Sequence, residues 1–177
     1  MRIGYSIIVS TSFLCAVSLC LATPSAADPA SMAVPLSATP PIRPFLSLEA
    51  AERGAKACLD LAGRQGLRVA IAIRDRGGNL VLFKRMDDVF VKQLELALLK
   101  AETGATTPLS TRDLGKIVKQ PDSALAGIEE VPGIIVVEGG EPIKNAAGYS
   151  LGGVGVSGAS PSQDGECARA AVAAIIQ

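Results

Sequence analysis

The sequence predicts one α+β domain, with a five-stranded antiparallel sheet flanked by N- and C-terminal helices and a central helical segment. One observation indicates the helices, because small and apolar residues recur at helical spacing near both ends of the folded part. A second indicates the sheet, because short apolar or alternating segments are separated by glycine-containing turns. Strands joined by tight turns run antiparallel, so a doubly wound parallel sheet is excluded.

The first 27 residues have the features of a secretory signal peptide. Arg2 supplies a positive charge, and Ile7–Ala22 is apolar apart from Ser, Thr and Cys. The small residues Pro24–Ala27 then provide a cleavage site before Asp28. The alternative, a membrane anchor, needs an apolar stretch of about 20 residues, which is longer than this one. We expect a periplasmic or secreted protein with no stable membrane span after processing.

Residues 28–44 form a Pro-rich lead-in, and residues 45–177 form the domain. The prolines of the lead-in exclude a helix or an inner strand there, so we expect extended chain. The remaining length suits one domain of ordinary size, and no internal repeat divides it.

The N-terminal half of the domain predicts a helix, a hairpin and a second helix. Ser47 is a suitable N-cap for a helix that ends at Gly63. The strands 67–74 and 80–83 are joined by a turn at 75–79, which contains paired glycines. A second helix over 90–103 is expected to bury its larger residues, and these are Val91, Leu94, Leu98 and Ala101.

The C-terminal half predicts a short helix, three strands and a final helix. Ser110 and Asp113 have the spacing of a capping box, so a short helix begins there. Strands are expected at 134–137, 143–147 and 151–156, with a turn at 139–142 between the first two. The final helix has the strongest signals, and they are Ser160 as cap, Pro161 in the first position and Gln163 in the capping box.

The charge balance restricts the classes of molecule that the protein can bind, and the cysteine count restricts the possible disulfides. The 17 basic and 17 acidic residues balance, and removing Arg2 with the signal peptide leaves one acidic charge in excess. We therefore expect no nucleic acid partner, because nothing provides a basic surface for phosphates. Cys58 and Cys167 remain after cleavage, and they form either a disulfide or two buried free thiols.

The chain has no histidine. This excludes Ser-His-Asp and Cys-His nucleophilic systems and imidazole bases, and it removes the commonest ligand of zinc and haem iron. No catalytic residue is assigned from the residues alone, and whether a metal binds is left open.

Three places could contact a small anionic ligand. Arg85, beside Met86 and Asp87, either binds a carboxylate or forms ordinary ion pairs at a strand end. Ser157 and Gly158, just before the final helix, either bind an anion or serve only the helix cap. Lys100 either reaches a pocket or extends its amine to solvent.

Several phrases in this order resemble the GlcG/HbpS-like haem-binding family, which includes the C-terminal domain of PduO-type proteins. They are Val69–Leu80, Phe83–Asp87, Lys100–Thr103, Gly139–Pro142 and Gly152–Gly158. The resemblance implies a five-stranded antiparallel sheet, a homo-oligomer, and binding of haem or a related tetrapyrrole. The family's Arg-Met-Asp phrase corresponds to Arg85, Met86 and Asp87, and its Gly-Gly-x-Pro phrase to Gly139, Gly140 and Pro142.

The chain differs from the haem-binding members of this family in the residue that would ligate the haem iron. Haem-binding members are thought to use a histidine in the first helix, and here the ligand would have to be Met86, Tyr149 or Cys58. The function that follows is an exported protein that binds a small ligand such as haem, as carrier or sensor. The alternatives are an enzyme or accessory factor for a small carboxylate, with Arg85 as anion clamp and Lys100 or Asp87 as acid–base, and an oligomeric assembly protein.

Overall fold

The structure is a computed structural model that describes residues 43–177. The expected signal peptide and most of the expected Pro-rich lead-in lie outside the described residues. Within them are four α-helices, a short 3₁₀ helix and four strands. In chain order these are α1 (Leu48–Arg64), β1 (Ala70–Asp75), β2 (Leu80–Arg85), α2 (Val91–Thr106), α3 (Thr111–Val118), η2 (Ile128–Glu130), β3 (Gly140–Lys144), β4 (Ser150–Ser157) and α4 (Pro161–Ile175).

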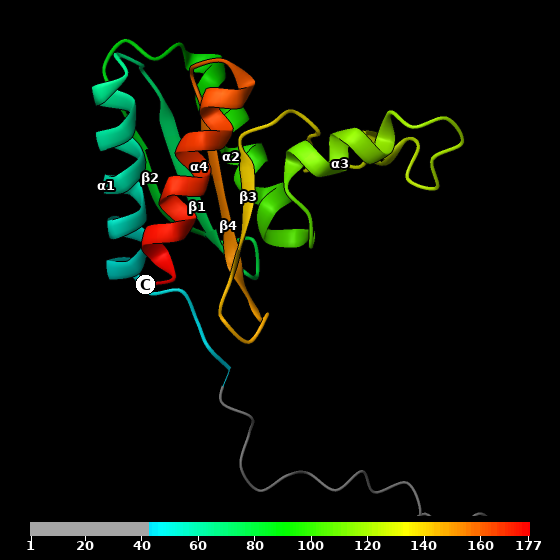
Figure 1. Ribbon diagram of the computed structural model, residues 1–177, viewed down its shortest axis with the longest axis horizontal. Coiled ribbons are helices and arrows are strands. Elements are labelled where there is room, and N and C mark those ends of the chain that lie inside the picture. Colours follow the sequence, from blue (N-terminus) through cyan, green and yellow to red (C-terminus); the bar gives the residue numbers. More distant parts are fainter. Residues whose placement is uncertain (1–42) are drawn as a thin grey trace, which may run out of the picture. The chain divides into compact units, whose positions relative to one another are not determined.

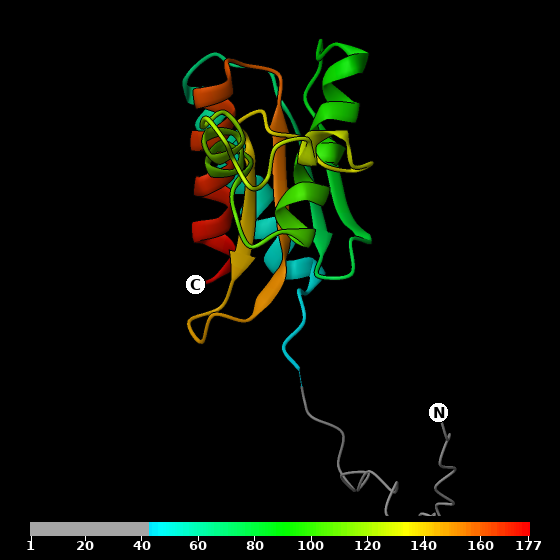
Figure 2. The same ribbon diagram turned by 90° about the vertical axis from the view of Figure 1, so that its right-hand side faces the viewer.

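The strands form one antiparallel sheet in the order β2-β1-β4-β3. Helices α1 and α4 lie together on one face, and α2 lies on the other (Figures 1 and 2). The α+β class and the antiparallel sheet with helices beside it are therefore as the sequence predicts. The sheet has four strands in the described part of the chain, and the expected number of five is wrong.

The face under α1 and α4 carries the larger apolar core. The side chains of Ile71 and Ile73 from β1, and of Val154 and Val156 from β4, are fully buried there. They meet small residues of the two helices, which lets α1 and α4 approach each other closely. Cys58 of α1 and Cys167 of α4 form a disulfide with Cα atoms 4.6 Å apart.

The opposite face is built from very small residues, and α2 lies almost directly on the strands. A Cβ on Gly155 would come within 2.1 Å of the Ala97 carbonyl oxygen, and one on Gly153 within 2.2 Å of the Ala105 nitrogen. Because the strand has no side chains here, the buried stripe of α2 consists of small residues and Lys100. Of the expected stripe, Ala101 is fully buried and Leu94 and Leu98 are partly buried, but Val91 is 71% exposed.

Local signals placed the helix starts correctly. The hydroxyl of Ser47 accepts a hydrogen bond from the backbone of Ala50, and that of Ser110 from the backbone of Asp113. Ser160 and Gln163 form the expected capping box. The 75–79 turn is also confirmed, since the Asp75 carboxylate accepts hydrogen bonds from the amides of Gly77 and Asn79.

The segment 134–137 is not a strand. The backbone amide of Ile135 donates to the hydroxyl of Thr103, which also lies 3.1 Å from the carbonyl oxygen of Gly133. A side chain of α2 thus supplies the partners that a neighbouring strand would have supplied. The backbone of the segment lies against α2 at Thr103 and against α3 at Gly115 instead of extending the sheet.

The expected turn at 139–142 is also wrong, because β3 already begins at Gly140. Gly140 pairs with Gly155, and the amide of Val156 donates to the carbonyl of Gly139. The chain bends at Gly139 itself, whose φ of 126° favours glycine. The next turn lies at 145–148, where the Asn145 side chain accepts hydrogen bonds from two following amides, so β3 ends at Lys144.

Candidate functional site

The predicted ligand-binding residues fall into separate places in the fold. Arg85, Met86 and Asp87 lie at the end of the edge strand β2. Lys100, Gly139, Ser157 and Gly158 come together where α2, β4 and α4 meet. This second group surrounds Asp164, so we call it the Asp164 junction.

The β2 group is largely solvent-exposed. The Arg85 and Asp87 side chains are exposed, while Met86 is partly buried against apolar residues of both sheet faces. Arg85 pairs across the sheet with Ala70, which in turn pairs with Ser157. Arg85 and Ser157 thus occupy one row, two strand spacings or about 10 Å apart. Ser157 is engaged elsewhere, since its hydroxyl donates to the Gln93 side chain at 2.6 Å.

The Asp164 junction contains a buried ion pair. The Lys100 amine lies 2.8 Å from the Asp164 carboxylate and donates a second hydrogen bond, at 2.9 Å, to the carbonyl of Val156. The other Asp164 oxygen accepts a hydrogen bond from the amide of Ala159. Both side chains are 3% exposed or less. The pair therefore joins α2 and α4 to the end of β4.

Burial dominates the electrostatics of this pair. It lowers the pKa of Lys100 and raises the pKa of Asp164, and the attraction between the two charges opposes both shifts. Gly139 covers the pair, because a Cβ there would lie 2.7 Å from the Lys100 amine and 2.9 Å from the Asp164 Cβ. With its amine held inside the core, Lys100 has a structural role in this arrangement.

The two remaining predicted residues belong to β3. The backbone amide of Gly140 donates to the hydroxyl of Thr111 at 2.9 Å, which fixes α3 against the sheet. Pro142 lies on the edge strand β3 and pairs with Gly153 of the inner strand β4. A role in ligand binding stays a prediction for all nine residues.

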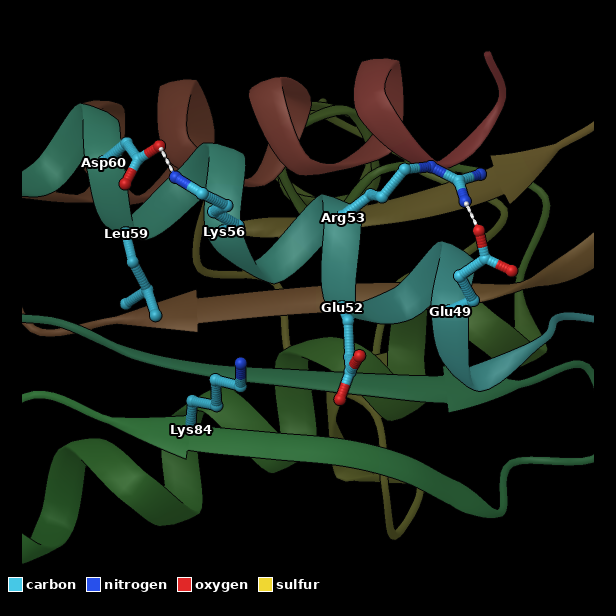
Figure 3. A pocket seen from close by; sticks show the side chains of 7 residues that line it. All are labelled: Glu49, Glu52, Arg53, Lys56, Leu59, Asp60 and Lys84. Atoms are coloured by element: carbon cyan, nitrogen blue, oxygen red, sulfur yellow. Dashed lines mark hydrogen bonds and ion pairs between the residues drawn. The ribbon is translucent and has the colours of Figure 1, made fainter.

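A groove lies at the opposite edge of the sheet, between α1 and β2. Its volume is about 590 Å³, within the range of small-molecule sites. We call it the α1–β2 groove, and its lining residues are Glu49, Glu52, Arg53, Lys56, Leu59, Asp60 and Lys84. Figure 3 shows Lys84 extending from β2 toward α1, with Glu52 and Leu59 pointing back toward it.

The charges of the groove are only partly matched. Arg53 pairs with Glu49 at 3.3 Å and Lys56 with Asp60 at 2.6 Å, both along the exposed side of α1. Lys84 makes no ion pair or side-chain hydrogen bond with any residue in 43–177. Figure 3 accordingly draws no interaction between its amine and the other lining residues. Its amine is therefore free to bind a carboxylate on a ligand.

Sequence reasoning missed two features here. Lys84 lies two residues after the buried Leu82, so strand alternation directs it toward the core face that α1 covers. That alternation was a usable signal. Asp164 lies in the first turn of α4 and its partner Lys100 is 64 residues away, so no local pattern indicated the pair.

The three residues considered as iron ligands have different surroundings. Cys58 is buried and bonded to Cys167, so its sulfur is not available. Tyr149 is 64% exposed beside the β3–β4 turn, away from the α1–β2 groove. Met86 is partly buried and follows β2 directly. Among residues 43–177, no cluster of three acidic or cysteine side chains is arranged for a metal ion, and no helix has the length and apolarity of a membrane span.

Comparisons with known proteins place this fold in a family. The family described as "Haem degrading protein HbpS-like" matches residues 46–173. A protein of Citrobacter freundii, described as an uncharacterised 15.0 kDa protein of the dhaT-dhaS intergenic region, is 34% identical over 121 residues, which are 67% of this chain and 84% of that protein. The corrinoid adenosyltransferase PduO of Salmonella typhimurium is 35% identical over 121 residues, but they are only 36% of that enzyme and 68% of this chain.

Solved structures of related proteins have the same fold as this chain. Klebsiella pneumoniae ORFY superposes with a TM-score of 0.72 at 30% identity, covering 79% of this chain and 96% of ORFY. A double mutant of Streptomyces reticuli HbpS gives 0.70 at 32% identity, covering 80% and 96%. The C-terminal domain of PduO in complex with haem gives 0.69 at 31% identity, covering 74% and 95%. The fold, the matched residues and these relatives together show that the chain belongs to the HbpS-like family.

Proposed function

We propose that this protein binds haem or a related tetrapyrrole in the α1–β2 groove and holds it through its carboxylates. The observation that carries the proposal is the Lys84 amine, which extends into a groove of about 590 Å³ without a partner among residues 43–177. A ligand carboxylate would supply that partner through a charge-assisted hydrogen bond. The haem complex of the PduO C-terminal domain supports the ligand class.

The residues of the groove suit the acidic periphery of such a ligand better than its iron. Leu59 offers apolar contact and Lys84 offers an unpaired positive charge, whereas the chain has no histidine. The ligand is therefore carried as cargo that is recognised through its carboxylates and ring. It follows that protoporphyrin IX without iron should bind about as tightly as haemin.

Titration of the protein with haemin and with metal-free protoporphyrin IX tests this proposal. We expect saturable changes in the Soret absorption for both ligands, with affinities within a few-fold of each other. Binding without saturation would contradict the proposal, as would strict dependence on iron.

A charge-neutral variant tests the groove itself. Lys84→Gln should weaken binding of both porphyrins roughly tenfold, the loss expected for one charge-assisted hydrogen bond. Lys92→Gln is the matched control, because Lys92 lies on α2, pairs with Glu95 and does not line the groove. Equal affinities for the two variants would place the ligand elsewhere.

The same proposal includes export and self-association. The signal-like residues 1–27 support export, and so does a disulfide that uses both cysteines beyond them. Large exposed apolar side chains such as Phe45 and Phe90 support a homo-oligomer. Native mass spectrometry of the exported protein would test both, with an oligomer whose chain begins at Asp28 as the expected result and a monomer with an intact N-terminus as the contrary one.

A further inference from the structure

A second pocket lies at the other edge of the sheet, where α3 faces the irregular segment 136–138. Its volume is about 510 Å³. We call it the α3 pocket, and its lining residues are Arg112, Gly115, Lys116, Lys119, Val136, Val137, Glu138 and Pro161. It belongs to the β3 side of the sheet and shares no residue with the α1–β2 groove.

The pocket owes its shape to the segment that fails to form a strand. Gly115 lets α3 rest directly on the chain, because a Cβ there would come within 2.4 Å of the Val136 carbonyl oxygen. The following residue, Val137, is left 44% exposed beside Pro161. The floor of the pocket is therefore apolar, although it lies at the surface.

One wall of the pocket is basic. Arg112, Lys116 and Lys119 recur at helical spacing, so α3 and its C-cap present all three to the same side. The single acidic lining residue, Glu138, is already in use, because one of its oxygens lies 3.2 Å from Arg169 and 3.6 Å from Arg112.

The remaining positive charges are unequally matched. Lys116 pairs with Asp113 at 3.1 Å on the exposed side of α3. Lys119 makes no side-chain hydrogen bond or ion pair within the range that the structure describes. An unmatched cation above an exposed apolar floor is complementary to a molecule with one anionic end and a hydrocarbon body.

We propose that the α3 pocket binds a small organic carboxylate whose apolar body lies on Val137 and Pro161 and whose carboxylate binds Lys119. The basic wall selects the charge and the apolar floor selects the body. Neither a bare inorganic anion nor a neutral molecule of the same shape satisfies both.

Calorimetric titration with three probes tests this inference. The probes are 3-phenylpropionate, its neutral counterpart 3-phenylpropanol, and inorganic phosphate. We expect saturable binding of 3-phenylpropionate and at least roughly tenfold weaker binding of the other two, since each lacks one of the two matched contacts. Equal binding of the alcohol would overturn the role of charge, and equal binding of phosphate would overturn the role of the apolar floor.

Variants at the two edges of the sheet separate this inference from the proposed porphyrin site. Lys119→Gln should weaken 3-phenylpropionate binding roughly tenfold, and Lys119→Glu should weaken it further, with porphyrin affinity unchanged. Lys84→Gln should give the reverse pattern. Because Lys119 is exposed and has no partner in the described part, both Lys119 variants should keep the wild-type melting temperature. Unaltered 3-phenylpropionate binding in Lys119→Glu would overturn the proposal.

Discussion

The α1–β2 groove and the Asp164 junction each contain a lysine, Lys84 of strand β2 and Lys100 of helix α2, but the surroundings of the two are opposite. Lys100 is buried, and its amine binds a carboxylate and a backbone carbonyl. Lys84 extends into an open groove and has no partner among the described residues. The first lysine is satisfied by the fold, whereas the second retains its capacity to bind.

This difference separates structural charge from charge that is available to a ligand. A buried ion that loses its partner destabilises the protein, because desolvation of the remaining charge is no longer offset. An exposed lysine without a partner contributes little to stability, so its removal should change ligand affinity and leave folding almost intact. Substitutions at the two sites should therefore give opposite patterns.

The largest effect is expected for Lys100→Met, which leaves Asp164 buried without its partner. The free energy of unfolding should fall by about 3–5 kcal/mol. The double variant Lys100→Met/Asp164→Leu removes both charges and should recover most of this loss. Urea denaturation of the wild type, the single variant and the double variant measures these free energies of unfolding. A loss below about 1 kcal/mol in the single variant would mean that the pair behaves like a surface ion pair.

The disulfide joins the helix of the groove to the helix of the junction, so its removal tests how strongly the two regions depend on each other. Cys58→Ala/Cys167→Ala should lower the free energy of unfolding by about 2–5 kcal/mol, because the bond closes a long loop. Denaturation with and without a reducing agent provides the measurement. Wild-type stability that does not respond to the reducing agent, with the bond shown to be reduced, would contradict this prediction.

A smaller, pH-dependent effect is expected at Glu141, which pairs with Arg169 near the junction. Burial raises the pKa of Glu141 above its ordinary value of 4.5. A raised pKa in the folded protein gives a stabilising contribution that is complete below 4.5 and is lost as the pH rises through the folded value. The stability of the wild type relative to Glu141→Gln should therefore decline as the pH rises above this point. Parallel stability curves for the two proteins would contradict the shift.

The smallest effect on folding is expected in the groove. Lys84→Gln should change the free energy of unfolding by no more than about 0.5 kcal/mol, because the amine makes no ion pair with any described residue. Thermal denaturation of the purified variant measures this change in stability. A loss as large as that of Lys100→Met would show that Lys84 is structural and would remove the contrast between the two lysines.

Features determined by neighbouring residues could be predicted from the sequence. The serine caps, the Asp75–Asn79 turn and the β1–β2 hairpin that this turn closes all depend on residues near one another in the chain. The strand expected at 134–137 failed because its backbone partner is the Thr103 side chain, about thirty residues earlier. Periodicity alone does not reveal such a partner.

The buried stripe of α2 shows the same limit. Size suggested that Val91 and the leucines face inward, but Gly153 and Gly155 bring the helix so close that only small residues fit between them. Lys100 lies on this stripe between Ala97 and Ala101 (one alanine three residues before it and one directly after it), which is how it reaches Asp164. The candidate site was predictable only as a region, the charged end of β2, because the groove also requires residues of α1.

The position of bound porphyrin tests the central claim most directly. Amide chemical shifts of the ¹⁵N-labelled protein, recorded during titration with metal-free protoporphyrin IX, would locate it. We predict that the largest changes fall in residues 49–60 and 84–86, with residues 111–119 unaffected. Changes centred on 111–119 and 136–138, with none along α1, would contradict the assignment of the groove as the porphyrin site.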